Sequence, residues 1–320
     1  MEKSNIFYFK NIVDTYYPTE KETVVTQDVV DSIRVKIKEL DDTAFSEMII
    51  SCFIPDLYSG MGKREKLFTK LTELMVGEWW RRMGGSYNLP TKKSGTEDVE
   101  LILDNNSIVC DAKVFRLGRS QKAPNVKDFL KLASVRIWID NLSSKYKGSN
   151  HSVIGGLITY SSLHEWESDS EVYEECTNSD TPVIMLPYEI LALLLKHKKN
   201  ANMSEFLKIW DFKANGVKTT RHKKQYWSYV TKFICNFLNI SEEDYKKEIN
   251  AYHDDIISSI EHYKKLIQDS IDLTSNQVLL EVQNYKDVKS LQDYVVKAIC
   301  ERDNSLALDC LKHIKQFRSY

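Results

Sequence analysis

One run of apolar residues near the middle of the chain constrains the fold most. Val153–Tyr160 reads Val-Ile-Gly-Gly-Leu-Ile-Thr-Tyr and shows no alternation of polar and apolar side chains. Such a run predicts a strand that is buried on both faces, because an exposed face would carry polar residues. Pro182–Leu186 is expected to be another strand and Tyr188–Lys198 a helix. Buried strands need helices against them, so an α/β core is predicted.

A β-hairpin is predicted upstream of this run, between residues 96 and 119. Polar and apolar residues begin to alternate at Asp98, turn-forming residues occupy positions 104–106, and Ser107–Phe115 is rich in β-formers. The hairpin adds antiparallel strands to the core. The sheet is therefore expected to be mixed.

Three charged residues of this hairpin are expected to meet. Successive side chains of a strand point to opposite faces, so Asp111 and Lys113 project together while Ala112 points into the body. Closure of the hairpin brings Asp98 beside them. Two carboxylates and an ammonium then share one site, an arrangement that can hold a hard divalent cation beside a phosphodiester.

The Asp-x-Lys pattern alone is weak evidence for such a site. Asp211, Asp244 and Asp287 also stand two positions before a lysine. Those copies lie in or beside segments predicted to be helical, where residues two apart do not face each other. The pair at Asp111 and Lys113 has a strand context and an upstream acid. From the residues alone, a surface hairpin with solvated charges is the alternative.

Helices are predicted before and after the core. Apolar residues recur every three or four positions in Arg64–Met83, which predicts one buried stripe. Helix is also expected at Thr26–Leu40 and at Asn125–Ile139, the latter with Phe129, Leu132, Ala133 and Ile137 inward. The last third is expected to be helical almost throughout, at Tyr226–Leu238, Glu242–Gln268 and Leu279–Phe317.

The predicted organisation has three regions. Residues 1–60 form a mainly helical packing region, residues 61–200 the α/β core, and residues 201–320 a helical region that serves DNA binding, dimerisation or both. The last region is expected to pack with the core as one unit. No apolar run approaches the roughly 18 residues of a membrane span, so no membrane contact is expected.

Positive charge is concentrated around the hairpin. Residues 61–149 contain 17 lysines and arginines against 10 aspartates and glutamates, whereas the whole chain has a net charge of −2. A local excess of basic residues is what a polyanionic substrate requires. The distribution therefore favours a nucleic-acid partner.

Several segments resemble the HindIII-type restriction endonucleases, members of the PD-(D/E)XK nuclease superfamily. The likeness spans about residues 63 to 265 and lies in Asp98, Cys110–Lys113, Phe115–Arg119, Glu65–Lys70, Trp210–Phe212 and Lys247–Asn250. The sequence departs from the superfamily pattern twice, since Thr96-Glu97-Asp98 replaces Pro-Asp and Asp111 stands where many members carry glutamate. Both departures keep the carboxylates.

The resemblance implies a restriction-endonuclease-like core and a catalytic site. Asp98, Asp111 and the Ala112 carbonyl would hold Mg²⁺, as one ion or two, and Lys113 would orient or deprotonate the attacking water. Glu65 is a further candidate, from the helix before the hairpin. Its alternative role is that of an acidic residue favouring the helix N-terminus.

The resemblance also implies the substrate and partners. Arg116, Arg119 and Lys122 are candidates for gripping phosphates or reading guanine edges of double-stranded DNA, the alternative being a solvated basic loop. The expected activity is type II: cleavage at a short palindrome to leave 5′-phosphate and 3′-hydroxyl ends, by a homodimer in the bacterial cytoplasm. A methyltransferase would act on the same DNA site without binding this protein.

Two other classes of function stay open from the sequence. One is a structure-selective repair or junction nuclease on the same core. The other is a protein without cleavage activity, which is either a DNA-binding module that kept the fold or a helical interaction protein. Digestion of unmodified phage DNA distinguishes the first from a restriction enzyme. Intact carboxylates and lysine argue against the second.

Overall fold

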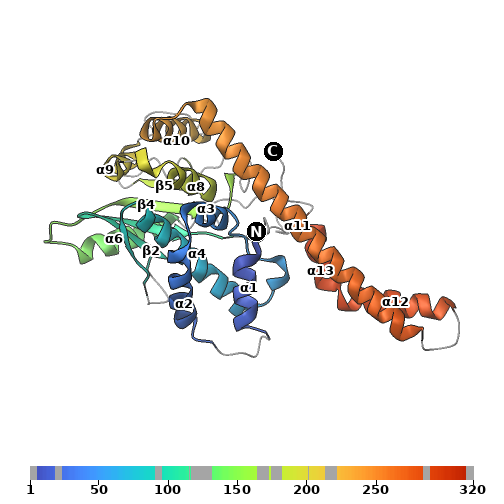
Figure 1. Ribbon diagram of the computed structural model, residues 1–320. Helices are drawn as coiled ribbons and strands as arrows, with labels where there is room; N and C mark the ends of the chain where they lie inside the picture. The colour runs from blue at the N-terminus through green and yellow to red at the C-terminus, as the bar shows by residue number, and fades with distance from the viewer. Residues whose placement is uncertain are drawn as a thin grey trace.

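The computed structural model describes residues 6–18, 24–90, 96–114, 116, 132–163, 173, 182–200, 202–212, 222–283 and 289–314. Figure 1 shows a body built around a β-sheet and a long helical arm that projects from it, formed by α11 (Glu242–Val282), α12 (Lys289–Asp303) and α13 (Ser305–Ile314). The mixed α/β architecture predicted from the sequence is confirmed. No helix among the described residues is both long and apolar enough to cross a membrane.

The sheet has five strands in the order β1-β2-β3-β4-β5. The first three strands are antiparallel to one another, and β3, β4 and β5 run parallel. The sheet is therefore mixed. The strands are β1 (Ser86–Asn88), β2 (Val99–Leu103), β3 (Asn106–Ala112), β4 (Ser152–Tyr160) and β5 (Val183–Pro187).

The predicted hairpin is formed by β2 and β3. Val99 pairs with Cys110 and Leu103 pairs with Asn106, which leaves a two-residue turn. Asp104 in this turn has φ of 53°, in the left-handed region that aspartate and asparagine tolerate better than most residues. The second strand ends at Ala112, three residues before the predicted end.

Adjacent glycines let β4 be covered closely on both faces. A Cβ atom on Gly155 would lie 2.5 Å from Trp210 Cδ1, and one on Gly156 would lie 2.8 Å from Val135 Cγ1. The indole N–H of Trp210 also donates to the Gly156 carbonyl at 2.8 Å. Because neighbouring residues of a strand face opposite sides, Val135 and Trp210 cover opposite faces of the sheet.

The helices of the body form layers on these two faces. Helix α6 packs on β3 and β4, whereas α4 packs on β1, β2 and β3. The N-terminal helices pack on α4 and on α8 (Figure 1). Helical elements of the body are α1 (Ile6–Tyr16), α2 (Thr26–Glu39), α3 (Asp42–Ile50), η1 (Asp56–Tyr58), α4 (Gly62–Arg82), α6 (Leu132–Lys145), α8 (Tyr188–Lys196), η3 (Lys198–Asn200), α9 (Met203–Phe206) and η4 (Leu207–Asp211).

The buried face of α6 differs from the prediction. Leu132 is buried as expected, but Ala133 is exposed and the side chain of Ile137 is 57% exposed. Val135, Ile139 and Leu142 are buried with Leu132 instead, at spacings of three and four. The predicted inward set was wrong because it placed the apolar stripe in the wrong helical phase. Phe129 lies outside the described residues.

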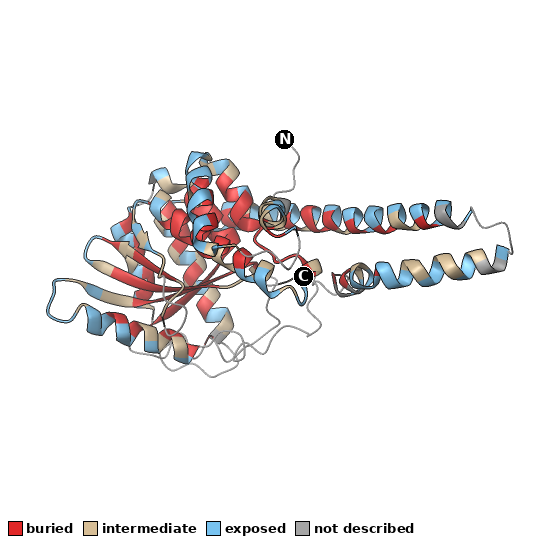
Figure 2. Ribbon diagram, turned by 90° about the horizontal axis from the view of Figure 1, so that it is seen from below, coloured by how far each residue is buried: buried red, intermediate tan, exposed pale blue. Residues whose placement is uncertain are grey.

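The C-terminal region is helical, as predicted, but its helices begin and end at other residues than predicted. It comprises α10 (His222–Leu238), α11 (Glu242–Val282), α12 (Lys289–Asp303) and α13 (Ser305–Ile314). Helix α11 continues past the expected end at Gln268, because no glycine or proline interrupts it. Figure 2 shows α11 and α12 extending side by side away from the sheet, with many exposed positions. The three-region division stays a prediction.

Candidate active site

Three of the predicted site residues, Asp98, Asp111 and Lys113, gather at one end of the sheet. The carboxyl ends of the parallel strands β3, β4 and β5 lie at this end of the sheet, which is where ligands of α/β sheets bind. Asp111 is the penultimate residue of β3, and Lys113 follows the strand. Asp98 directly precedes β2, which is antiparallel to β3, so it lies at the same end of the sheet.

Asp111 and Lys113 form the centre of the cluster. Lys113 Nζ lies 2.6 Å from Asp111 Oδ1, and the Asp111 side chain is only 1% exposed. The Lys113 N–H donates to the Thr159 carbonyl of β4 at 2.8 Å. The parallel neighbour strand therefore continues to hold the chain one residue beyond the end of β3.

Asp98 is fixed by the opposite side of the hairpin. Its N–H donates to the Cys110 carbonyl at 3.1 Å, and its Oδ2 accepts from the Ala112 N–H at 3.1 Å. Burial raises the pKa of Asp98 well above its usual range, and the nearby negative charges of Asp111 and Glu73 raise it further. This site thus concentrates negative charge where little water is present, which favours a bound cation or proton.

Glu73 of α4 is a charged group near this site that was not predicted from the sequence. Its side chain is buried and forms an ion pair with Lys70. Burial raises the pKa of Glu73 despite that ion pair, and the charge of Asp111 adds to the effect. One signal was present in the sequence: Glu73 and Glu78 are the acidic residues of an otherwise largely apolar run from 71 to 80. A buried acid in such a run needs a partner or a function.

The donor groups of this cluster fit a divalent cation. Both carboxylate oxygens of Asp111 are buried beside the Asp98 carboxyl and the Lys113 ammonium, whose Nζ lies 2.6 Å from Oδ1. Within the described ranges, no group of three or more histidine, cysteine, aspartate or glutamate side chains has the spacing of a metal site. Mg²⁺ commonly uses only one or two carboxylates and completes its shell with water. Asp98 and Asp111 satisfy that requirement.

Glu65 and Arg116 are paired with each other. Glu65 lies in the first turn of α4 and forms an ion pair with Arg116 Nη2. Arg116 Nη1 also donates to Ser59 Oγ at 3.3 Å, and the Arg116 backbone forms a parallel bridge with Ile54. These contacts tie the chain that follows β3 to the beginning of α4. The predicted catalytic role of Glu65 and DNA contact of Arg116 stay predictions.

The other predicted site residues are Ala112, Arg119 and Lys122. Ala112 is buried, and its N–H is used by Asp98, while its carbonyl as a metal ligand stays a prediction. Arg119 and Lys122 lie outside the described residues. Their predicted contacts with DNA stay predictions as well.

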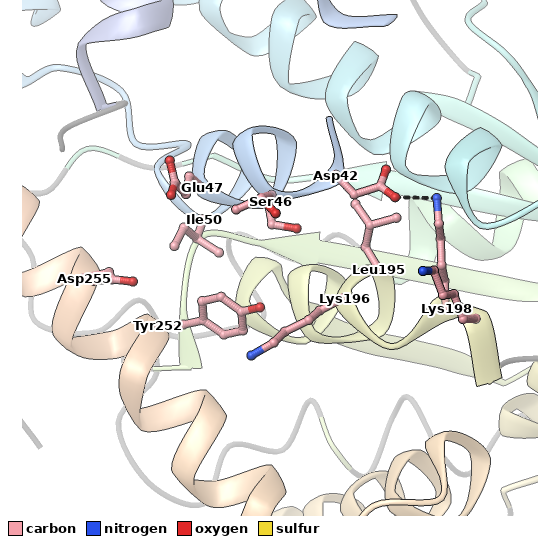
Figure 3. Close-up of a pocket in the computed structure, with 11 residues that line it drawn as sticks. Asp42, Ser46, Glu47, Ile50, Leu195, Lys196, Lys198, Tyr252 and Asp255 are labelled. Carbon is pink, nitrogen blue, oxygen red and sulfur yellow. Dashed lines mark ion pairs between the residues drawn. The ribbon is translucent and has the colours of Figure 1, made fainter. Parts of the chain in front are cut away.

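A pocket of about 300 Å³ lies elsewhere, between α3, α8 and α11 (Figure 3). Its lining includes Asp42, Lys198 and Tyr252, with Asp42 and Lys198 joined as an ion pair at 2.5 Å. None of the predicted catalytic residues lines it. The chemistry of the carboxylate cluster, rather than the presence of a cavity, therefore identifies the candidate site.

Comparison with known proteins places the chain in a family. The family model described as HindIII restriction endonuclease matches residues 22–299, which include the whole hairpin and most of the helical arm. A search of curated proteins gave no match. The matched range begins well before the segments that carried the sequence resemblance and extends beyond them.

Proposed function

Because the chain belongs to the HindIII restriction endonuclease family, we propose that it is a Mg²⁺-dependent type II enzyme. Its substrate would be double-stranded DNA with a short palindromic site, and its products would carry 5′-phosphate and 3′-hydroxyl ends. The observation that carries this proposal is the cluster of Asp98, Asp111 and Lys113 at the carboxyl end of β3. We further propose a PD-(D/E)XK core and a cytoplasmic location.

The roles of the residues follow from their surroundings. Asp98, Asp111 and the Ala112 carbonyl would hold Mg²⁺, which when bound neutralises phosphate charge and lowers the pKa of a water molecule. The Lys113 ammonium, beside Asp111, would orient that water and offset the charge that develops on the phosphate oxygens. Attack on phosphorus and release of the 3′ oxygen would leave the phosphate on the 5′ end.

Glu73 and Lys70 extend this cluster. The charge of Glu73 acts on both Asp98 and Asp111, so it would increase the attraction for a divalent cation. Lys70 limits that negative charge through its ion pair with Glu73. We propose that Glu73, rather than Glu65, is the acidic residue of α4 that belongs to the catalytic cluster.

Digestion of unmodified phage DNA tests the proposed function. With Mg²⁺, the purified protein should produce discrete fragments with ligatable 5′-phosphate ends, because it would cut at one sequence. With EDTA, it should produce no fragments, because EDTA removes the cation that would neutralise the phosphate, and the two carboxylates are themselves negative. Gel electrophoresis and sequencing of the ends of a limit digest provide the measurement.

Two outcomes would contradict the proposal. Nicking confined to branched or gapped DNA would indicate a structure-selective repair nuclease. Binding of DNA without cleavage at any Mg²⁺ concentration would indicate a protein that has lost catalysis. Digestion of DNA carrying the cognate methylation is the control, and it should leave the DNA intact.

We also propose that the enzyme acts as a homodimer through its helical arm. Leu266, Leu273 and Leu280 lie seven residues apart on α11, and their side chains are 42%, 60% and 64% exposed. Leucines at a seven-residue interval lie on one face of the helix and repeat one position of the heptad that helices use to pack against a second helix. A second copy of the chain would supply that helix and the second active site needed to cut both strands of a palindrome.

Substitution of Leu273 by glutamate tests the dimer. Sedimentation should show a dimer for the wild-type protein and a monomer for Leu273→Glu, because the charge would be buried in the interface. The variant should also nick DNA more than it cuts both strands. Val35→Glu, at an exposed valine of α2, is the matched control and should leave the dimer intact. A wild-type monomer, both free and on DNA, would remove the dimer proposal.

A further inference from the structure

The ammonium of Lys113 depends on a backbone that lies outside regular structure. Strand β3 ends at Ala112, so Lys113 lies one residue beyond the strand. A lysine side chain has four rotatable bonds, and its ammonium can be placed well only if its backbone is held. The contacts that hold the Lys113 backbone therefore determine how well its ammonium is placed beside Asp111.

Two hydrogen bonds from different elements hold Lys113. Its N–H donates to the Thr159 carbonyl of β4 at 2.8 Å. Its carbonyl accepts from the Tyr188 hydroxyl, also at 2.8 Å. The first bond continues the parallel ladder by one residue. The second comes from a side chain at the beginning of α8, on the far side of β4.

Tyr188 is itself rigidly held. It directly follows β5, begins α8, and is fully buried. Helix α8 packs on α3, and the indole N–H of Trp79 donates to the Leu191 carbonyl of α8 at 2.9 Å. Burial raises the pKa of Tyr188 well above its usual range, so its hydroxyl keeps the proton that it donates. The donor is therefore present and fixed in position.

We propose that Tyr188 is a positioning residue for DNA cleavage: its hydroxyl fixes the Lys113 peptide so that the Lys113 ammonium stays against Asp111. The inference rests on the proposed catalytic role of Lys113. Tyr188 acts through Lys113 and does not touch the substrate itself. Its removal should therefore slow the chemical step without weakening DNA binding.

The structure offers a matched control for this inference. Tyr226 is also a fully buried tyrosine, and its hydroxyl exchanges hydrogen bonds of 2.6 Å with the N–H and carbonyl of Met185 in β5. Neither bond involves Lys113. Tyr226→Phe thus removes a buried hydroxyl beside the same sheet without releasing the catalytic lysine.

The test compares Tyr188→Phe with Tyr226→Phe on the full-length protein. Tyr188→Phe should lower the single-turnover cleavage rate by about 10- to 100-fold, because a small displacement of a catalytic group has effects of that size. Its affinity for DNA in Ca²⁺ should change by less than about twofold. Tyr226→Phe should change neither quantity by more than about twofold, although both variants lose buried hydrogen bonds.

Two unnatural residues at position 188 separate hydrogen bonding from packing. 4-Aminophenylalanine keeps a donor at the position of the hydroxyl and should restore most of the cleavage rate. 4-Methylphenylalanine has nearly the same shape and no donor, so it should remain as slow as phenylalanine. This pair also serves if Tyr188→Phe does not fold, since both side chains fill the space. Equal rates for the two would overturn the inference.

Lys113→Ala separates failure of this inference from failure of the proposed site. If Lys113→Ala cleaves as the wild type does, the proposed catalytic role of Lys113 is wrong, and the inference falls with it. If Lys113→Ala cleaves far more slowly than the wild type while Tyr188→Phe behaves like Tyr226→Phe, only the positioning role of Tyr188 is overturned. An additional loss from Tyr188→Phe in the Lys113→Ala background would also overturn it, because the two residues would then act independently.

Discussion

Asp111→Asn should lower the rate of DNA cleavage by about 100-fold or more, because it removes a charged group that would act in the transition state. The carboxylate is buried between Asp98 and Lys113, and an amide can occupy the same space because asparagine has nearly the same size and shape as aspartate. The amide, however, carries no charge to hold a cation or to face Lys113. Single-turnover cleavage in Mg²⁺ measures the loss, and DNA binding in Ca²⁺ should be retained.

Asp244→Asn is the control for this prediction. Asp244 stands two positions before a lysine, as Asp111 does, but it lies in the first turn of α11. The Ser241 hydroxyl donates to Asp244 Oδ2 at 2.7 Å, a bond that asparagine can also accept. Asp244→Asn should therefore cleave at the wild-type rate. Cleavage by Asp111→Asn at the wild-type rate would show that the catalytic site lies elsewhere.

Glu189→Gln should change the pH dependence of stability. Glu189 is buried in the first turn of α8, and its Oε1 accepts from the Ser162 hydroxyl. Burial raises the pKa of this carboxyl to about 7 in the folded protein, although the Ser162 hydroxyl lowers it in part. The unfolded chain would release the proton near pH 4.5. Between these two pKa values the folded state binds more protons, so the free energy of unfolding falls as pH rises.

Glutamine removes this loss because it stays neutral. Relative to the wild type, the free energy of unfolding of Glu189→Gln should increase by about 2 to 3 kcal/mol between about pH 5 and pH 8. Urea denaturation at several pH values measures it. Glu205→Gln, at an exposed position of α9, removes the same charge and should show no such trend. Parallel stability curves for Glu189→Gln and the wild type would contradict the prediction.

The strands and their connections were largely predictable from local patterns. Turn-forming residues at 104–106 and an apolar run without alternation predicted the strands that are confirmed as β2, β3 and β4, although Asn106 belongs to β3 rather than to the turn. The face of α6 was not predictable to the same extent. Apolar residues occur on more than one side of that helix, so the pattern does not fix its phase, and Ile137 is exposed in the structure.

The candidate site was predictable only where its residues are close in sequence. Asp98, Asp111 and Lys113 lie on one hairpin, whose register follows from the turn. Glu73 and Tyr188 reach the site from α4 and from the beginning of α8, and those positions depend on how helices pack on the sheet. Spacing along a chain carries no information about such packing, so neither residue was expected.

The hydrogen bonds of the site differ greatly in sequence separation. The bond from Ala112 to Asp98 spans 14 residues, whereas the bond from Tyr188 to Lys113 spans 75. Closing a short loop costs less conformational entropy than closing a long one, so hairpin contacts can form before α8 has docked. The carboxylates can thus be assembled while the lysine is still misplaced. On the proposed roles, a nascent chain would bring Asp98 and Asp111 together early and would reach its full rate of DNA cleavage only when α8 is in place.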